Sequence, residues 1–327
     1  MKFRTEISIP PNQWKITHSM RGIAVGSCFT SYIGNALQQA KFPIMVHPFG
    51  TVYNPVSIAQ SFNLLFEKQH ISENDIVQNQ GVFTSFLLHS SFSARSKQAV
   101  INAYYTRVQE FKAKFQPLDY AIISLGTAWV YEYCKTGDVV SNCHKFPASD
   151  FTHRRLTVAE IEKTLEELVQ TIREHSPTCR IIFTISPIRH WKNGAHENQI
   201  SKSLLFVALE SFMQHTKNTY YFPAYELVID ELRDYRFYAD DMLHPNTMAV
   251  QYIQKAFSNC YFSEETQALV HEIEAIHKAQ NHKPYHADSE EYAKFLRAHA
   301  THTTRLQTQY PHLDFSEELQ FFTKSQK

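Results

Sequence analysis

Two uninterrupted apolar runs constrain the fold of this chain more than any other feature. They read YAIISLGTAWVY, beginning at Tyr120, and RIIFTISP, beginning at Arg180. A strand that is apolar on both faces is typical of a parallel sheet with helices packed on each side. Between these runs, residues 157–175 form an amphipathic pattern, with Thr157 as N-cap and Glu160 at capping-box distance. The alternation predicts an α/β fold with a mostly parallel sheet.

The same alternation extends along most of the chain. We expect strands at 23–25, 42–50, 81–93, 120–131, 180–187 and 219–226, and helices at 29–40, 55–69, 94–115, 157–175, 201–214 and 245–257. From about Ser263 the sequence becomes polar with a helical pattern, and seven of the 18 histidines lie there. We therefore predict an α/β domain over residues 1–262 and a helical, His-rich extension with a solvated face over residues 263–327.

Charge and cysteine content narrow the function classes. The chain has 32 Lys and Arg, 32 Asp and Glu and a formal net charge of +0, whereas nucleic-acid binders show a basic excess. No apolar run is long enough to span a bilayer, and residues 1–14 lack the apolar core of a secretory signal. The five cysteines form no CxxC pair, which favours free thiols in a reducing compartment. We expect a cytoplasmic protein without a nucleic-acid partner, metal or cofactor, and the oligomeric state stays open.

A sharp strand-to-helix turn carries two nucleophilic side chains, Ser27 and Cys28, directly after Gly26. In an open α/β sheet, ligands bind outside the carboxyl ends of the strands, which is where this turn lies. The first turn of a helix has unpaired N–H groups and the positive end of the dipole, which stabilise a thiolate and an oxyanion. The alternative is structural: the glycine permits the turn and the serine caps the helix.

A second candidate is the loop YADDMLHPN, which contains Asp241 and His244. An acyl-transfer site needs a base for the nucleophile's proton and a carboxylate that fixes the tautomer of that base. The three-residue spacing meets both needs within one loop, although an ordinary surface loop has the same pattern. Asp240 beside Asp241 raises the question of a metal, but no histidine motif for metal binding accompanies the two carboxylates.

Further polar groups follow other predicted strands. Gly50 and Gly126 lie at turns where backbone N–H groups can approach an oxyanion, and Asn54 can add a side-chain donor. Thr127 and His190 are expected to line the same pocket. Each of these residues, taken alone, also fits an ordinary turn or surface position.

Together these pieces resemble the GSCFA family, named after the motif that reads Gly26-Ser27-Cys28-Phe29-Thr30 here, with Thr in place of the final Ala. The resemblance runs through HPFGTVYNP, SLGTAWVYE and YADDMLHPN and covers about residues 1–262. That family is grouped with the SGNH (GDSL-like) hydrolases, which implies a three-layer α/β/α fold that cleaves or transfers acyl esters.

The resemblance also assigns positions. The Gly-Asp-Ser block of SGNH hydrolases falls on Gly26-Ser27-Cys28, so Cys28 stands at the nucleophile position. The glycine of the second block falls on Gly50. The Gly-x-Asn-Asp block falls on residues 126–129, where the asparagine donor is missing. The final Asp-x-x-His block is matched by Asp241 and His244.

The sequence thus predicts a hydrolase of ester bonds that acts on a small acyl group carried by a sugar or a lipid-derived alcohol. Cys28 is the expected nucleophile with Ser27 as its rival, His244 the base and Asp241 the residue that orients it. Two alternatives stay open: an acyltransferase with a thioester donor, and a non-catalytic ligand-binding protein on the same fold.

Overall fold

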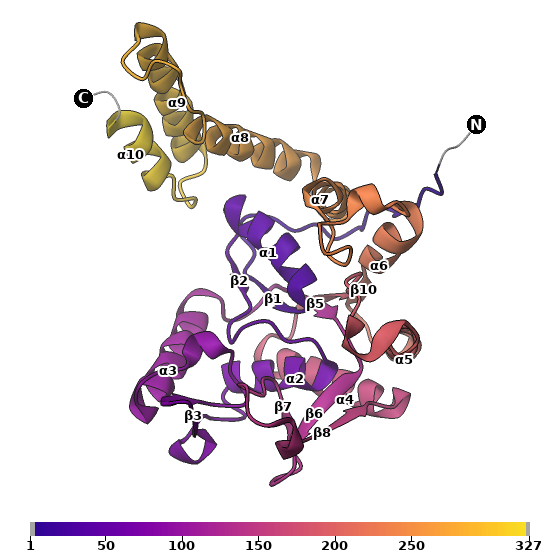
Figure 1. The fold of residues 1–327 in the computed structure, drawn as a ribbon. Helices are drawn as coiled ribbons and strands as arrows, with labels where there is room; N and C mark the ends of the chain where they lie inside the picture. The colour runs from indigo at the N-terminus through magenta and orange to yellow at the C-terminus, as the bar shows by residue number, and fades with distance from the viewer. Residues whose placement is uncertain (1–3, 325–327) are drawn as a thin grey trace.

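A five-stranded parallel sheet forms the centre of the protein. The computed structural model describes residues 4–324, and its main sheet has the order β2-β1-β5-β9-β10 (Figure 1). The strands are β1 (Gly22–Gly26), β2 (Ile44–Val46), β5 (Tyr120–Leu125), β9 (Arg180–Ile185) and β10 (Thr219–Tyr221). All of their pairings are parallel, with Gly22 opposite both Ile44 and Tyr120.

Helices cover both faces of this sheet. Ile23, Val25 and Ile123 belong to one apolar cluster with side chains of α2, α4 and α5, whereas Ala24 and Ile122 belong to a second cluster with α1 and α7. The helices are α1 (Cys28–Gln39), α2 (Pro55–Leu65), α3 (Lys97–Lys114), α4 (Val158–His175), α5 (Gly194–Gln214), α6 (Ala224–Glu226) and α7 (Thr247–Tyr261). The predicted three-layer α/β/α arrangement is confirmed.

The strand order determines where a ligand can bind. The chain passes from β1 to β2 on one side of the sheet and then crosses to β5, β9 and β10 on the other. Such a reversal opens a crevice at the carboxyl ends of the two strands where it occurs, here β1 and β5. The turns that begin at Gly26 and Gly126 therefore border this crevice.

The predicted continuous strand over 120–131 is wrong, because the chain leaves the main sheet at residues 126–128. Beyond that break, β6 (Trp129–Tyr133) pairs with β7 (Val139–Val140) and β8 (Phe151–Arg155) in a separate antiparallel sheet. Side-chain hydrogen bonds replace the ladder at the break, since Ser201 Oγ accepts from the N–H of Ala128 at 2.7 Å.

The predicted strand over 81–93 is also shorter than expected. Only β4 (Val82–Thr84) is extended, and it pairs with β3 (Val77–Asn79) in a small hairpin. The chain then turns, with a 3-10 segment at Ser90–Phe92. The capping box of Thr157 and Glu160 at the start of α4 is confirmed.

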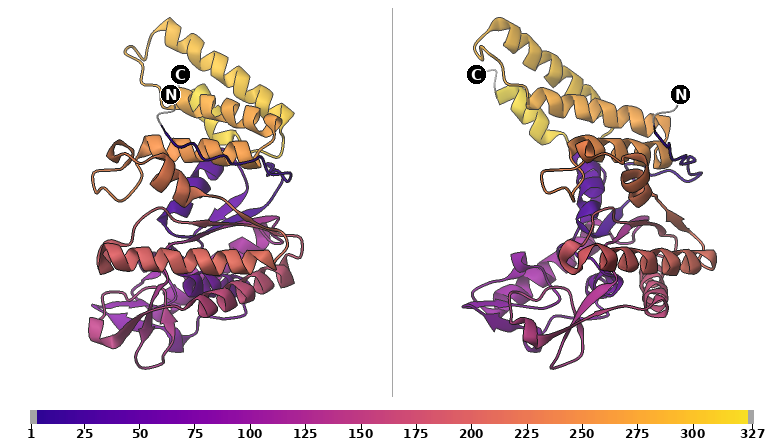
Figure 2. Two further views of the ribbon diagram at one scale, coloured as in Figure 1. Left: turned by 90° about the vertical axis from the view of Figure 1, so that its right-hand side faces the viewer. Right: turned by 45° about the vertical axis from the view of Figure 1, so that its right-hand side comes forward.

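The C-terminal region is helical as predicted, but it is more than a solvated face. Its helices α8 (Glu264–Gln280), α9 (Glu290–Gln309) and α10 (Ser316–Lys324) enclose an apolar cluster of their own. Figure 2 shows this region stacked beyond α7 at one end of the molecule. Lys41, just after α1, donates to the carbonyl of Asp314 at 2.6 Å and pairs with Glu318 at 2.8 Å. Among residues 4–324, no helix is both long and apolar enough to cross a bilayer.

Candidate active site

The turn after β1 presses closely against β5. Gly26 has φ +142°, and a Cβ there would lie 2.2 Å from the carbonyl oxygen of Ser124, so this position requires glycine. The N–H of Ser27 donates to the same carbonyl at 3.1 Å. The helix α1 therefore begins directly at the crevice between β1 and β5.

The structure separates the two nucleophilic side chains of this turn. Ser27 is 2% exposed, and its Oγ accepts from the N–H of Phe29 at 3.3 Å and pairs with Ser124 Oγ at 2.9 Å. Cys28 is only half-buried, and its Sγ lies 3.4 Å from Tyr53 Oη. The structural and the chemical interpretations of the turn thus apply to different residues: Ser27 caps the helix, and Cys28 is accessible.

Tyr53 is the neighbour of Cys28 that the sequence analysis missed. Its carbonyl oxygen accepts from the N–H groups of Gly126 at 2.7 Å and Thr127 at 3.0 Å, which ties the loop after β2 to the end of β5. Burial, followed by the hydrogen bond and charge of Cys28, raises the pKa of the Tyr53 phenol far above 10. The phenol therefore keeps its proton at neutral pH and can donate a hydrogen bond beside the Cys28 sulfur.

Asn54 and Gly50 serve the backbone in this structure. Asn54 caps α2, with Oδ1 accepting from the N–H of Ser57 at 2.8 Å and Nδ2 donating to the Oγ of the same residue at 3.1 Å. The N–H of Gly50 donates to the carbonyl of His47, and a Cβ at Gly50 would lie 2.1 Å from His89 Cβ. The backbone N–H of Gly50 and one amide hydrogen of Asn54 are thus engaged within their own segments.

Gly126 and Thr127 form the floor of the crevice. Both N–H groups are taken by the Tyr53 carbonyl, and Thr127 Oγ1 pairs with Ser201 Oγ at 3.0 Å. A Cβ at Gly126 would lie 3.3 Å from the Cβ of Ser27 and 3.0 Å from the Tyr53 carbonyl oxygen. The close approach of the two strand ends explains the glycine, while the amide hydrogen of Gly126 is already committed.

A buried lysine holds this floor in place. Lys202 of α5 is 1% exposed, and its Nζ donates to the carbonyl oxygens of Gly126 and Ser186, each at 2.6 Å. These carbonyls follow β5 and β9, so one side chain bridges two strand ends. Burial lowers the pKa of Lys202 to about 7. Lys202 lies three residues before Leu205 and so on the same buried face of α5. Helical spacing in the sequence could therefore have indicated that Lys202 is buried.

The Asp241–His244 pair is brought together as predicted from its spacing. His244 Nδ1 lies 2.5 Å from Asp241 Oδ2, and Asp241 Oδ1 accepts from the N–H groups of Leu243 and His244, each at 2.9 Å. The two backbone hydrogen bonds, followed by the His244 ring, lower the pKa of Asp241 to about 2. With Nδ1 held by the carboxylate, Nε2 is the nitrogen left to exchange a proton.

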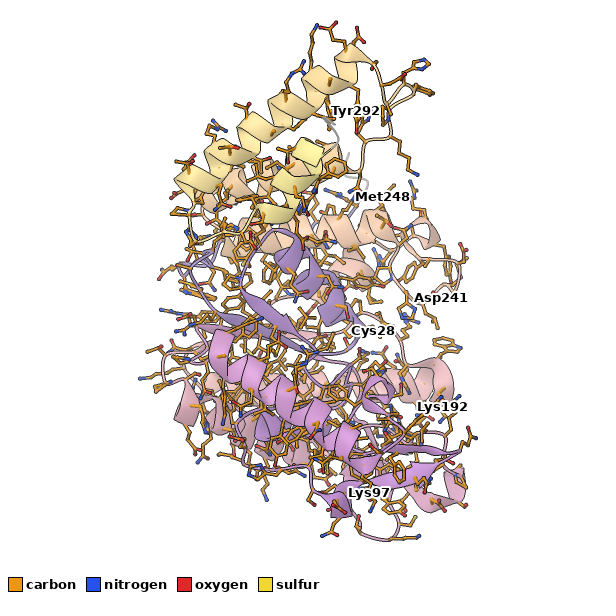
Figure 3. The ribbon with its side chains drawn as sticks, turned by 90° about the vertical axis from the view of Figure 1, so that its left-hand side faces the viewer. Cys28, Lys97, Lys192, Asp241, Met248 and Tyr292 are labelled. Atoms are coloured by element: carbon orange, nitrogen blue, oxygen red, sulfur yellow. The ribbon has the colours of Figure 1, made fainter. Side chains whose placement is uncertain are left out.

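One hydrogen bond ties the helix that follows this loop to α1. Gln254 of α7 donates to the carbonyl of Tyr32 in α1 at 2.9 Å, which fixes the two helices whose N-termini carry the loop and Cys28. Burial and then the charges of Cys28 and Asp241 raise the pKa of the Tyr32 phenol. In Figure 3, Asp241 lies toward the right-hand edge of the molecule and Cys28 lies farther in. Cys28 and His244 themselves make no hydrogen bond in this structure.

His190 lies on the other side of Tyr53, with ring centroids 6.4 Å apart. Its N–H donates to Asn198 Oδ1 at 2.9 Å. Burial and then the cations Lys202 and Lys192 lower the pKa of His190, which favours a neutral imidazole at this edge. Among residues 4–324, no three His, Cys, Asp or Glu side chains gather as a metal site, and Asp240 joins no such group.

Comparison with known protein families identifies the family of this chain. The sequence model of the GSCFA family matches residues 21–257, which is most of the chain. The chain belongs to the GSCFA family. A second model, described as the C-terminal domain of GSCFA domain proteins, matches residues 273–326 of this GSCFA chain. The resemblance drawn from the motifs is thereby confirmed at the level of the family. A search of the curated proteins finds no match.

Three esterases are among the solved structures that match this chain. A carbohydrate esterase family 2 enzyme plus carbohydrate binding domain from Corynascus thermopiles (Myceliophthora fergusii) has 11% identity and a TM-score of 0.38, over 81% of the GSCFA chain and 69% of that chain. A carbohydrate esterase family 3 protein from Talaromyces cellulolyticus has 11% identity and a TM-score of 0.36. The match covers 78% of the GSCFA chain and 99% of that chain. An acetyl xylan esterase from the rumen bacterium Butyrivibrio proteoclasticus has 10% identity and a TM-score of 0.37. The match covers 77% of the GSCFA chain and 64% of that chain. Likeness of this degree carries no conclusion about the substrate of the GSCFA chain.

Proposed function

We propose that this protein is an ester hydrolase of the SGNH type, with Cys28 as nucleophile, His244 as general base and Asp241 as the residue that orients it. One observation supports this most strongly. An imidazole held by a carboxylate at 2.5 Å lies in the loop before α7, and a hydrogen bond ties α7 to α1, the helix that begins with the half-buried thiol of Cys28. Nucleophile, base and orienting acid are the three parts that acyl transfer requires.

The proposed reaction proceeds through a thioester. His244 Nε2 takes the proton of the Cys28 thiol as Sγ attacks the ester carbonyl carbon. The C–O bond to the alcohol then breaks, and the alcohol leaves with the proton from His244. Water next attacks the thioester while His244 accepts its proton, the C–S bond breaks, and the carboxylic acid and free thiol are restored. The mechanism requires His244 Nε2 to come within hydrogen-bond distance of Cys28 Sγ during the reaction.

Two donors are suited to stabilise the oxyanion of the tetrahedral intermediate. The N–H of Cys28 is at the first position of α1, where helical N–H groups have no intrahelical acceptor. The phenol of Tyr53 lies 3.4 Å from Sγ and keeps its proton. We assign Tyr53 the role of the asparagine that the SGNH pattern would place after Gly126, because Asn54 is committed to capping α2.

The decisive experiment is peptide mass spectrometry after exposure to 4-nitrophenyl acetate. We expect an acetyl group on Cys28 in the wild type and in Ser27→Ala, and none on Cys28 in His244→Ala. The exposed free thiol of Cys134 is an internal control, because any acetylation there should not depend on His244. Formation of the adduct with slow release, accelerated by an added alcohol, would favour an acyltransferase.

Two results would contradict the proposal. Acetylation of Ser27 in place of Cys28 would reverse the assignment of the nucleophile. Acetylation of Cys28 and Cys134 to the same extent in wild type and His244→Ala would show only ordinary thiol reactivity. If, in addition, 4-nitrophenyl acetate is not turned over, that second result would favour a ligand-binding protein.

A further inference from the structure

A groove of about 540 Å³ opens beside the Asp241–His244 loop. Arg189 and Trp191, which follow β9, form one side, and Arg233, Tyr235 and Tyr238, which follow α6, form the other. Asp241 lines the same groove, so the groove and the candidate active site share this residue. A volume of this size is within the range of small-molecule sites.

The two arginines of this groove form no ion pair with the two aspartates that line it. Arg189 and Arg233 have no hydrogen bond or ion pair with any residue of 4–324, although both line the groove. The carboxylates that line it are already engaged. Asp234 pairs with Arg236 at 2.7 Å, and Asp241 pairs with His244. Two free guanidinium groups beside committed carboxylates are suited to an anion, since guanidinium forms paired hydrogen bonds with carboxylate or phosphate.

Aromatic rings form much of the remaining wall. The side chains of Trp191 and Tyr235 are 47% and 75% exposed, and Tyr235 and Tyr238 have ring centroids 6.0 Å apart. Exposed rings of this kind offer flat apolar faces with polar edges, which suit a small ring that is itself partly apolar. A lipid chain instead needs a long apolar channel, whereas this groove is open and carries two unpaired cations.

We infer that the groove binds the alcohol part of the substrate, and that this part is a sugar bearing a carboxylate or phosphate. The inference rests on the proposed ester hydrolysis at Cys28. Arg189 and Arg233 bind the anionic group, Trp191 and Tyr235 contact the ring, and the acyl group extends past Asp241 and His244 to Cys28. A neutral acetyl sugar lacks the charged contact and binds more weakly.

A binding experiment tests the inference without requiring turnover. Cys28→Ala is titrated with D-glucuronate, D-glucose 6-phosphate and D-glucose, with protein NMR or calorimetry as the readout. We expect both anions to bind at least tenfold more tightly than glucose, and less tightly as salt rises. The two anions distinguish a carboxylate site from a phosphate site. Equal affinity for glucose and both anions, or no binding of any of them, would overturn the inference.

Matched charge variants locate the site. In the Cys28→Ala background, Arg189→Gln and Arg233→Gln should each weaken anion binding by about tenfold, the loss of one charged contact. Arg297→Gln removes an exposed arginine of α9 and should leave binding unchanged. An equal effect of all three variants would mean that overall charge, rather than the groove, attracts the anion, and would overturn the assignment.

Turnover distinguishes the failure of this inference from the failure of the proposed function. With Cys28 intact, the ratio of kcat/KM for acetylated glucuronate to that for acetylated glucose should fall about tenfold in Arg189→Gln. If both esters are hydrolysed and the ratio of their kcat/KM values is unchanged in Arg189→Gln, the groove does not bind the substrate. The proposed ester hydrolysis would be unaffected by that result. Anion binding that depends on Arg189, with no hydrolysis of any ester, would leave the groove standing and contradict the proposed function.

Discussion

Two histidine–carboxylate pairs in this protein lie in contrasting surroundings. Asp241 and His244 are three residues apart in one loop, 47% and 37% exposed, with 2.5 Å between Oδ2 and Nδ1. Glu318 and His277 come from α10 and α8, with 3.3 Å between Oε1 and Nε2, and Glu318 is 5% exposed. Lys41 adds a second cation to Glu318 at 2.8 Å.

The difference between the pairs shows what each can do. Two backbone N–H groups, then the imidazole, hold the pKa of Asp241 at about 2, so the loop itself orients His244 toward the crevice. Burial opposes ionisation of Glu318, but His277 and Lys41 lower its pKa to about 2. Those partners belong to other elements, so the charge of Glu318 secures the docking of the C-terminal helices. The first pair suits proton transfer, and the second suits stability.

Replacing the histidine of each pair should give the largest difference between the Asp241–His244 and Glu318–His277 pairs. His244→Ala should lower kcat/KM for 4-nitrophenyl acetate at least about 10³-fold, because removal of a triad base costs up to about 10⁶-fold in kcat. His277→Ala should keep kcat/KM within about twofold and lower the thermal midpoint instead. Steady-state kinetics and thermal unfolding of both variants provide the check, and a large kinetic effect of His277→Ala would contradict the assignment of roles.

Asp241→Asn sharpens the role of the carboxylate. The amide oxygen of asparagine can still accept the N–H groups of Leu243 and His244, so the loop should stay folded. The loss of charge beside Nδ1 should lower kcat by about 10²- to 10³-fold with little change in KM. The separate measurement of kcat and KM decides the matter. A change confined to KM would mean that Asp241 contacts substrate rather than orienting the base.

Glu318→Gln tests the second pair through pH. Because the folded-state pKa of about 2 lies below the ordinary 4.5, the ionised carboxylate stabilises the fold above about pH 4.5 and loses this effect as pH falls toward 2. The variant should be about 2 kcal/mol less stable at pH 7. The difference should shrink steadily below pH 4.5. Urea unfolding followed through the C-terminal helices from pH 7 to 2 measures it, and a difference that does not vary with pH would contradict this account.

The smallest expected effect is that of Lys41→Met. It removes the ammonium group, which contacts Glu318, the Asp314 carbonyl and the ring of Phe315, and puts an uncharged apolar side chain in its place. We expect a loss of about 1 kcal/mol and faster hydrogen exchange in α10. Lys163→Met, on an exposed pair with Glu167, is the control and should change stability by less than about 0.5 kcal/mol. Equal effects of the two variants would show that Lys41 is not a docking contact.

Local spacing explains most of what could be predicted of the site. Asp241 and His244 meet because three residues of loop bring them within reach. Cys28 lies at the crevice because a strand turns directly into a helix at Gly26. Tyr53 was missed although it precedes Asn54, because the choice between the two depends on α2: the asparagine is used as its cap, which leaves the tyrosine facing Cys28.

Other features depend on segments far apart in the chain. The break of the 120–131 run depends on Ser201, 73 residues beyond Ala128, which accepts the N–H that a continuous strand would have used. The groove arginines Arg189 and Arg233 come from separate loops, and only the folded chain shows that neither finds a carboxylate. Long-range contacts of this kind leave no periodic signal in the sequence.

The sequence by itself determined the alternation of strands and helices, the capping box at Thr157 and the Asp–His loop, because apolar period, caps and short spacings act between near neighbours. Only the tertiary structure decided which of Ser27 and Cys28 is accessible. The two side chains are adjacent and chemically alike, but Ser124 of β5 takes up the serine hydroxyl and leaves the thiol beside Tyr53. It also decided that the polar C-terminal helices enclose their own apolar core, because their few apolar residues come together only when three helices pack.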